Sequence, residues 1–205
     1  MTGTLYLLPC SLGESDHRQF LPPDVARIIP SLTYYIVENL RTARRYLKSI
    51  DRDTNIDACT FFELNKHTSP DEVPLFIEPL LNGSDTGLIT EAGLPGIADP
   101  GASVIRLAHQ GNIRVKPLTG PSSLFLALMA SGLNGQAFRF SGYLPVNRNE
   151  RIEAIRRLEE KALHDDESQL FIETPYRNNA LLNDLLARCR PDTLLTIAVD
   201  LTLEN

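Results

Sequence analysis

Short runs of β-branched and aromatic residues alternate with longer amphipathic segments along the whole chain, and this alternation constrains the fold most. Strands that alternate with helices are joined by right-handed crossovers and form largely parallel sheets with helices on both faces. The sequence therefore predicts an α/β fold with mainly parallel or mixed sheets. The expected strands are Thr4–Leu8, Thr33–Val37, Cys59–Leu64, Gly87–Thr90, Ile113–Leu118, Phe138–Ser141, Gln169–Glu173 and Leu194–Val199.

Several connecting segments carry helix-start and helix-stop signals. Ser69–Glu72 combines an N-cap serine, a first-turn proline and a capping-box glutamate. Asp99 is placed to open the next helix and Gly111 to end it, and Thr174-Pro175 is placed to open a third. We therefore expect helices directly after these signals.

Composition narrows the class of protein. The chain carries 26 acidic residues against 20 Lys and Arg, a formal net charge of −6, and 42% of its residues are hydrophobic. This excludes a disordered chain and argues against nucleic-acid binding by bulk charge. The three cysteines form no CxxC pair and the four histidines lack metal-ligand spacing, so we expect a reducing compartment and no metal. The longest apolar run, Leu124–Ala130, is too short to span a membrane, which favours a soluble cytoplasmic protein.

Two glycine- and proline-containing loops follow expected strands. Thr90–Gly101 has twelve residues, whereas strand-to-helix loops usually have about 2–6, and its glycines would let the backbone approach a ligand closely. Thr119–Ser123 follows the next strand and leads into a helix of small residues. Neither loop is a GxGxxG fingerprint or a P-loop. Simple turns and helix capping remain the alternatives to ligand binding.

These segments belong to a longer series of blocks. Thr90–Gly101 resembles the DAGTPGISDPG block of the tetrapyrrole methylase superfamily, in its ribosomal-RNA ribose 2′-O-methyltransferase branch. Thr119–Leu133 is similar to PGPSALxxALxxSGL, and Phe140–Arg151 to FxGFLPxKxxER. Phe171–Arg177 resembles FYESPHR, and Leu201-Thr202 stands where the family has LTK. Four blocks in the same order and spacing identify the chain as a member of the superfamily.

The resemblance implies two α/β domains, residues 1–118 and 119–205, with a ligand cleft between them. It also implies S-adenosylmethionine as the methyl donor, bound largely by backbone, and a homodimer. By block match, the donor pocket would contain Gly93, Leu94, Pro95, Ile97, Asp99, Ser122, Ser123, Thr174 and Tyr176.

The chemistry needs few acid–base groups, because a sulfonium methyl is already activated and alignment of the acceptor supplies much of the acceleration. A hydroxyl acceptor must still lose its proton, so one basic group is expected near the methyl. Three carboxylates in matched blocks are candidates, although each is also explained by a structural role: Glu38, Glu91 and Glu173.

Some blocks depart from the family pattern, so the chain is a diverged member. Pro9–Glu14 stands where the family has ATPIGN, and Glu38–Arg41 stands where it has EDTR. Glu91 replaces the aspartate of DAG, and Leu203 replaces the lysine of LTK. These departures leave the donor assignment better supported than the acceptor assignment.

One helix offers a local basic surface. Positive side chains recur at helical spacing opposite an apolar face, and they could neutralise RNA phosphates or be a solvated face: Arg41, Arg44, Arg45, Lys48 and Arg52. We therefore expect a methyltransferase that acts on a ribose of ribosomal RNA in the small ribosomal subunit. Methylation of a small molecule such as a tetrapyrrole and a non-catalytic nucleoside-binding scaffold are the alternatives.

Overall fold

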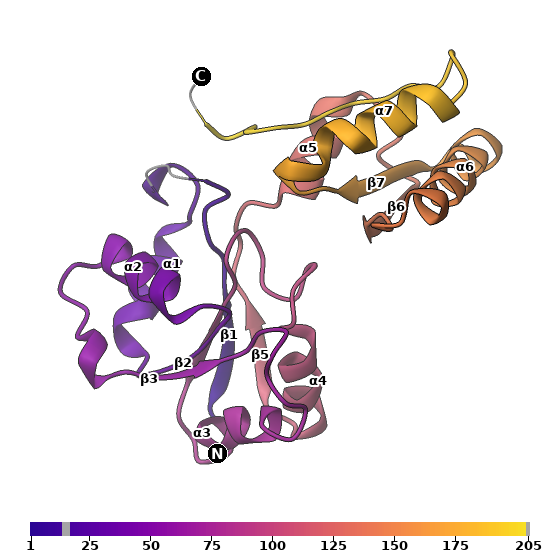
Figure 1. The fold of residues 1–205 in the computed structure, drawn as a ribbon. Helices are drawn as coiled ribbons and strands as arrows, with labels where there is room; N and C mark the ends of the chain where they lie inside the picture. Colours follow the sequence, from indigo (N-terminus) through magenta and orange to yellow (C-terminus); the bar gives the residue numbers. More distant parts are fainter. Residues whose placement is uncertain (14–16, 204–205) are drawn as a thin grey trace. The chain divides into compact units, whose positions relative to one another are not determined.

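Seven strands form within the part of the chain that the structure, a computed structural model, describes, namely residues 1–13 and 17–203. Glu14, the last residue of the block that replaces ATPIGN, lies outside the described residues. The chain divides into two compact units, one of Met1–Ser123 with the C-terminal residues from Thr202, and one of Leu124–Leu201. Each unit has its own parallel sheet (Figure 1).

The first unit contains a five-stranded sheet in the order β3-β2-β4-β1-β5, with every neighbouring pair parallel. The strands are β1 (Thr4–Leu8), β2 (Tyr34–Val37), β3 (Thr60–Glu63), β4 (Thr86–Ile89) and β5 (Arg114–Pro117). All four residues of β4 are buried, as expected for a strand inside a parallel sheet that is covered on both faces. The predicted fold class is confirmed.

Alternate residues of the central strands face two separate hydrophobic layers. Leu7, Ile36 and Leu88 pack with one set of helices, whereas their neighbours, such as Leu8 and Val37, pack with the other. The helices that pack with Leu8 and Val37 cover one face of the sheet: η1 (His17–Gln19), α1 (Pro23–Ile28), η2 (Ile29–Ser31), α2 (Leu40–Ile50) and η3 (Ile56–Ala58). The helices that pack with Leu7, Ile36 and Leu88 cover the other face: η4 (Val73–Ile77), α3 (Glu78–Leu81) and α4 (Ala102–Gln110). The helices α2 and α4 therefore lie on opposite sides of the sheet (Figure 1).

The second unit is smaller. Its two parallel strands, β6 (Phe138–Tyr143) and β7 (Ser168–Ile172), flank α6 in sequence. Its helices are α5 (Ser123–Ser131), α6 (Arg148–Asp165), η5 (Pro175–Arg177) and α7 (Asn178–Arg188). The core forms where Ile155 of α6 meets Leu181 and Leu185 of α7.

Two expectations about secondary structure are wrong. Leu194–Val199 is not a strand, and its apolar side chains are exposed, with Leu194 at 77% and Val199 at 64%. A β-branched composition favours a strand only where a neighbouring strand supplies ladder partners. In addition, Ser69 does not open an α-helix: residues 70–72 form a turn and the 3₁₀ helix η4 follows at Val73.

None of the helices in the described ranges is long and apolar enough to cross a bilayer. The domain boundary expected after residue 118 stays a prediction.

Candidate functional site

The order of the strands places a switch point at the carboxyl ends of β1 and β4. These strands are neighbours, but the chain leaves β1 towards β2 on one side and leaves β4 towards β5 on the other. The two connections pass over opposite faces of the sheet, through α1 and α4. In open parallel sheets, ligands bind in the crevice outside such a switch point. Pro9 and Thr90, the first residues after β1 and β4, are therefore at the candidate site.

The loop after β4 has an unusual backbone. Gly93 and Gly96 have φ values of +72° and +87°, and Ala98 has +61°. Glycine adopts this left-handed region without strain, which explains the first two residues. A Cβ atom on Gly93 would lie 3.2 Å from Leu12 Cδ2. The positive φ values of Gly93 and Gly96 thus favour the glycines that the sequence singled out, and the space beside Gly93 is tight.

Cys10 ties the loop after β1 to the loop after β4. Its amide donates to the carbonyl of Gly93 at 2.8 Å, and its thiol donates to the carbonyl of Thr90 at 3.2 Å. Burial raises the pKa of Cys10 to about 12, and the negative charge of Glu91 adds to the rise. The thiol is therefore protonated at neutral pH and serves as a structural donor.

Asp99 fixes the second half of the loop. Its carboxylate accepts from the amide of Gly96 at 2.8 Å and from the amide of Gly101 at 2.7 Å. Burial raises the pKa of Asp99, and these hydrogen bonds offset part of that rise. The helix α4 begins at Ala102 with Gly101 as its N-cap residue, so Asp99 shapes the loop and is not itself the cap.

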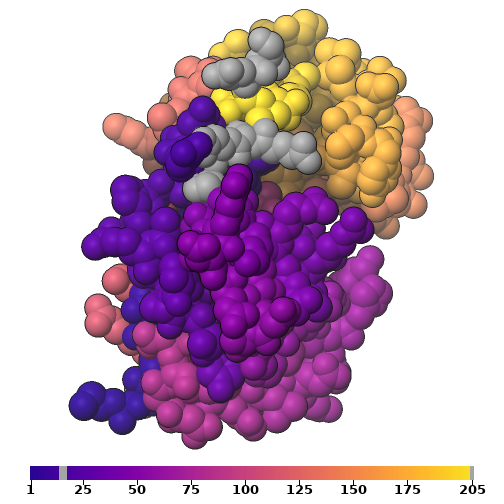
Figure 2. Space-filling view, turned by 90° about the vertical axis from the view of Figure 1, so that its left-hand side faces the viewer, coloured from indigo at the N-terminus to yellow at the C-terminus, as the bar shows by residue number. Residues whose placement is uncertain are grey.

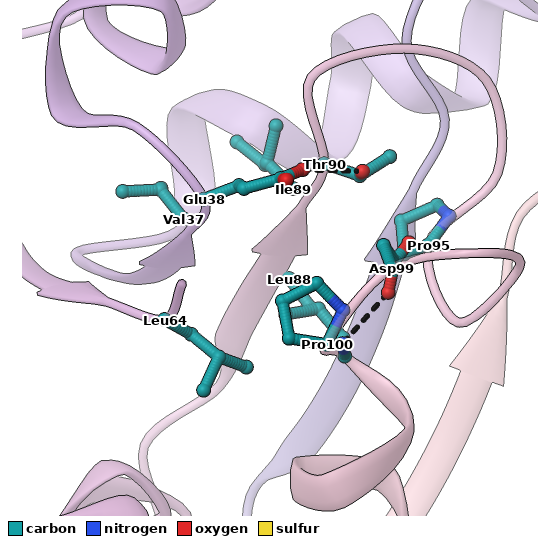
Figure 3. Close-up of a pocket in the computed structure, with 10 residues that line it drawn as sticks. Val37, Glu38, Leu64, Leu88, Ile89, Thr90, Pro95, Asp99 and Pro100 are labelled. Atoms are coloured by element: carbon teal, nitrogen blue, oxygen red, sulfur yellow. Dashed lines mark hydrogen bonds between the residues drawn. The ribbon is translucent and has the colours of Figure 1, made fainter. Parts of the chain in front are cut away.

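Glu38 joins β2 to the same loop. Its Oε2 atom accepts from the hydroxyl of Thr90 at 3.1 Å and from the amide of Glu91 at 3.2 Å. In Figure 3 the side chains of Glu38 and Thr90 point toward one another, while Asp99 lies on the other side of the depression. The cavity volume is about 10 Å³, which suits one water molecule and is far too small for a nucleoside.

Glu91 faces α2. It is exposed and its carboxylate contacts the hydroxyl of Thr42. Tyr46, one turn further along α2, donates its hydroxyl to the carbonyl of Pro9 at 2.6 Å. Both loops of the switch point are therefore attached to α2. No sequence pattern indicates these roles of Thr42 and Tyr46, because each contact joins segments that are far apart in the chain.

The remaining donor-pocket residues of the first unit differ in exposure. Pro95 is buried and lines the depression, Leu94 is half-buried, and Ile97 is 49% exposed. The segment before α5 approaches the β1 loop closely, since a Cβ atom on Gly120 would lie only 2.1 Å from Pro9. Ser122 and Ser123 follow it, half-buried and exposed respectively.

Three expected site residues belong to the second unit. Glu173 is half-buried, with its side chain 6% exposed, and it pairs with Arg177 at 2.9 Å and accepts from the amide of Thr174 at 2.8 Å. Thr174 is half-buried, and Tyr176 is 85% exposed. The ion pair with Arg177 gives Glu173 a structural role, and the role of the other two in donor binding stays a prediction.

Sequence reasoning missed a buried ion pair in the second unit. Arg151 and Asp184 lie 2.6 Å apart and are 7% and 3% exposed, and Arg148 also contacts Asp184 at 3.0 Å. Arg151 donates to the carbonyl of Val146 at 2.9 Å, and Arg177 donates to the carbonyl of Leu144 at 2.8 Å. The two arginines of the matched blocks thus fix the backbone after β6, which their place in those blocks could have indicated.

The cations of α2 are all exposed. Arg41, Arg44, Arg45 and Lys48 lie on the face opposite the buried Ala43 and Leu47, as their spacing predicts. No group of three or more potential metal ligands comes together within residues 1–13 and 17–203.

The fold and this site define an α/β protein that presents glycine-rich loops at the carboxyl edge of a doubly wound sheet. No family model matches the chain. It is 30% identical over 201 residues to ribosomal RNA small subunit methyltransferase I of Streptococcus pyogenes serotype M6, covering 98% of this chain and 66% of that protein. The protein of the same name from Pseudomonas aeruginosa is 30% identical over 89% of this chain and 61% of its own length. The Xylella fastidiosa protein of that name is 29% identical, over 98% and 69%.

A crystal structure of uroporphyrin-III-C-methyltransferase from Thermus thermophilus aligns with a TM-score of 0.46 and 18% identity, over 72% of this chain and 65% of that one. The chain spans about two thirds of the length of the curated relatives it matches. The chain belongs to the family of these small-subunit methyltransferase I proteins.

Proposed function

We propose that the protein transfers a methyl group from S-adenosylmethionine to the 2′-hydroxyl of a ribose in small-subunit ribosomal RNA. One observation carries the proposal: the loop that contains the most specific sequence block, Thr90–Gly101, is also the loop that leaves β4 at the switch point. The names of the relatives support methyl transfer to small-subunit ribosomal RNA. A homodimer and a cytoplasmic location complete the proposal.

The first unit suits a donor bound mainly through backbone. Gly93 and Gly96 hold the loop in a conformation without side chains at the bends, and Asp99 fixes that conformation through two amides. When bound, S-adenosylmethionine supplies the activated methyl group. The depression beside Asp99 holds only about one water, so it is one wall of the pocket. Gly93, Leu94, Pro95, Ile97, Ser122, Ser123, Thr174 and Tyr176 are the other residues that we assign to donor binding.

The acceptor hydroxyl must lose a proton, and the three candidate carboxylates differ in their availability. Glu173 is already engaged in an ion pair with Arg177. Glu38 already accepts from Thr90 and from the Glu91 amide. Glu91 is exposed at the carboxyl edge of the sheet, so we assign it as the first candidate for the proton acceptor.

Two measurements test this function. Calorimetry should detect binding of S-adenosylmethionine and of its demethylated product. Labelled donor should transfer methyl groups to small ribosomal subunits isolated from cells that lack this protein, and nuclease digestion should place the label on a ribose. Binding without transfer would support a scaffold, and transfer to a tetrapyrrole instead of the subunit would support a small-molecule enzyme. Absence of donor binding would contradict both enzymatic functions.

A further inference from the structure

The helix α2 has a charge composition opposite to that of the chain. It contains four of the 20 Lys and Arg residues and none of the 26 acidic residues, although the net charge of the chain is −6. By contrast, α6 mixes both signs, and its Arg156 pairs with Glu153. The positive charge of α2 is therefore a local feature that the surrounding helix does not neutralise.

The four cations form one stripe, which we call the α2 stripe: Arg41, Arg44, Arg45 and Lys48. An α-helix has 3.6 residues per turn, so these positions fall within about 100° of one another around the axis. Like charges at i, i+3 and i, i+4 oppose helix formation. The apolar contacts of α2 come from the opposite face, through Ala43 and Leu47. The stripe thus contributes none of the buried side chains of α2 and is unfavourable for the isolated helix.

Within the described residues no carboxylate forms an ion pair with a cation of the stripe, and Asp51, just after the helix, has only an electrostatic interaction with Lys48. Arg44 stacks over the ring of Phe61 at 5.4 Å, and the Lys48 ammonium donates to the carbonyl of Arg52 at 2.8 Å. Within residues 1–13 and 17–203, no acidic side chain forms an ion pair with Arg41 or Arg45. Figure 2 views the molecule from the side on which α2 lies in Figure 1, and side chains of this region protrude there.

The stripe begins next to the candidate site. Asn39 caps α2 by accepting from the amides of Arg41 and Thr42, and Thr42 contacts Glu91 of the β4 loop. Tyr46 attaches the middle of the helix to Pro9 of the β1 loop. The orientation of the stripe relative to the switch point is therefore fixed by contacts at two places within the first unit.

We infer that the α2 stripe binds consecutive phosphates of an RNA strand and leads that strand to the carboxyl edge of the first sheet. The inference deepens the proposed function, on which it rests for the identity of the polyanion. From Arg41 to Lys48 the stripe is about 10 Å long, and phosphates along one strand of a duplex are about 3.4 Å apart along its axis. The stripe can therefore follow several phosphates, and it reads charge rather than base sequence.

Binding of a labelled 12-nucleotide single-stranded RNA, measured over a range of salt concentrations, tests the stripe. The double variant Arg41→Gln/Arg45→Gln removes two exposed charges of the stripe. Arg106→Gln/Arg114→Gln removes two exposed charges from α4 and β5 and is the matched control. Each lost phosphate contact reduces the slope of log K against log salt by about 0.7 for a single strand. We expect the stripe variant to lose about 1.4 from that slope and the control variant to keep the wild-type slope.

Donor calorimetry separates this inference from the proposed function. Both variants should bind S-adenosylmethionine as the wild type does, because the substituted side chains are exposed and outside the donor loops. Equal slopes for the two variants, or a wild type that does not bind the RNA at low salt, would overturn the inference. RNA binding with the expected slopes but no donor binding would leave the stripe in place and refute the methyltransferase.

Discussion

The hydroxyl of Thr90 donates to the carboxylate of Glu38 at 3.1 Å, across 52 residues of sequence. Each residue directly follows a strand, Glu38 after β2 and Thr90 after β4, and these strands are neighbours in the sheet. The contact therefore holds the start of the glycine-rich loop against the end of β2.

Replacing Thr90 by Val keeps the side-chain shape and removes the donor. We expect the free energy of unfolding to fall by about 1 kcal/mol, the usual value for one hydrogen bond. Glu38→Gln should cost less, because the amide oxygen can still accept. In a double-mutant cycle measured by urea unfolding, the two changes should couple by more than about 0.5 kcal/mol. Thr33→Val, at an exposed position, is the control and should couple with neither; additive effects at Thr90 and Glu38 would contradict the contact.

Gly93 should not tolerate a β-branched residue. Its φ of +72° is unfavourable for L residues, and a Cβ atom would lie 3.2 Å from Leu12. Gly93→Val should therefore lower the thermal midpoint as well as donor affinity, and Gly93→Asn should lower both less, since Asn enters this region more readily. Gly111→Ala, where φ is −83°, is the control; a valine variant with wild-type stability would show that the loop has another conformation.

Arg151 should be essential for the stability of the second unit. Removing one partner of a buried ion pair costs about 3–5 kcal/mol, because the other charge stays buried. Hydrogen exchange in peptides of α6 and α7 should therefore be strongly accelerated by Arg151→Gln. The exposed pair Arg156–Glu153 on the same helix provides the control. Arg156→Gln should change the free energy of opening, as measured by hydrogen exchange, by less than about 1 kcal/mol. Similar effects of the two substitutions would show that Asp184 is not buried with Arg151.

The same pair predicts a pH dependence. Arg151, with a smaller contribution from Arg148, holds the pKa of Asp184 below its ordinary value of 3.8. The unfolded chain then binds the proton more readily, so the contribution of Asp184 to stability is complete above pH 3.8 and is lost as the pH falls through the lowered pKa. Exchange in α6 and α7 should accelerate in that range beyond its intrinsic pH dependence. The Asp184→Asn variant, which is destabilised at all pH values, should lack this additional acceleration at low pH. An equal acceleration in the variant would show that other carboxyl groups cause it.

Cys10 should be inert in the folded protein. Its pKa of about 12 leaves almost no thiolate at pH 8, and its side chain is buried. Ellman's reagent should therefore titrate the same number of thiols in native wild type and native Cys10→Ser, and one thiol fewer in the denatured variant. A native-state difference between the two proteins would show that Cys10 is accessible.

The success and failure of sequence reasoning have physical causes. The strand positions were predictable within one or two residues, since buried parallel strands are short apolar runs, and the glycines of the β4 loop mark positive φ values. The failures depend on partners. Leu194–Val199 has strand propensity but no neighbouring strand in the described residues. The contacts of Glu38 and Cys10 with the β4 loop likewise need the three-dimensional register of the sheet.

The position of β1 between β4 and β5 also sets the order of events during synthesis. Thr4–Leu8 emerges from the ribosome before its partners, residues 86–89 and 114–117. At about 5–20 residues per second, the first strand waits on the order of ten seconds before the central pairs can form. During that time the largely apolar segment Leu5–Leu8 has neither of its native partner strands, so its burial depends on residues that are made much later.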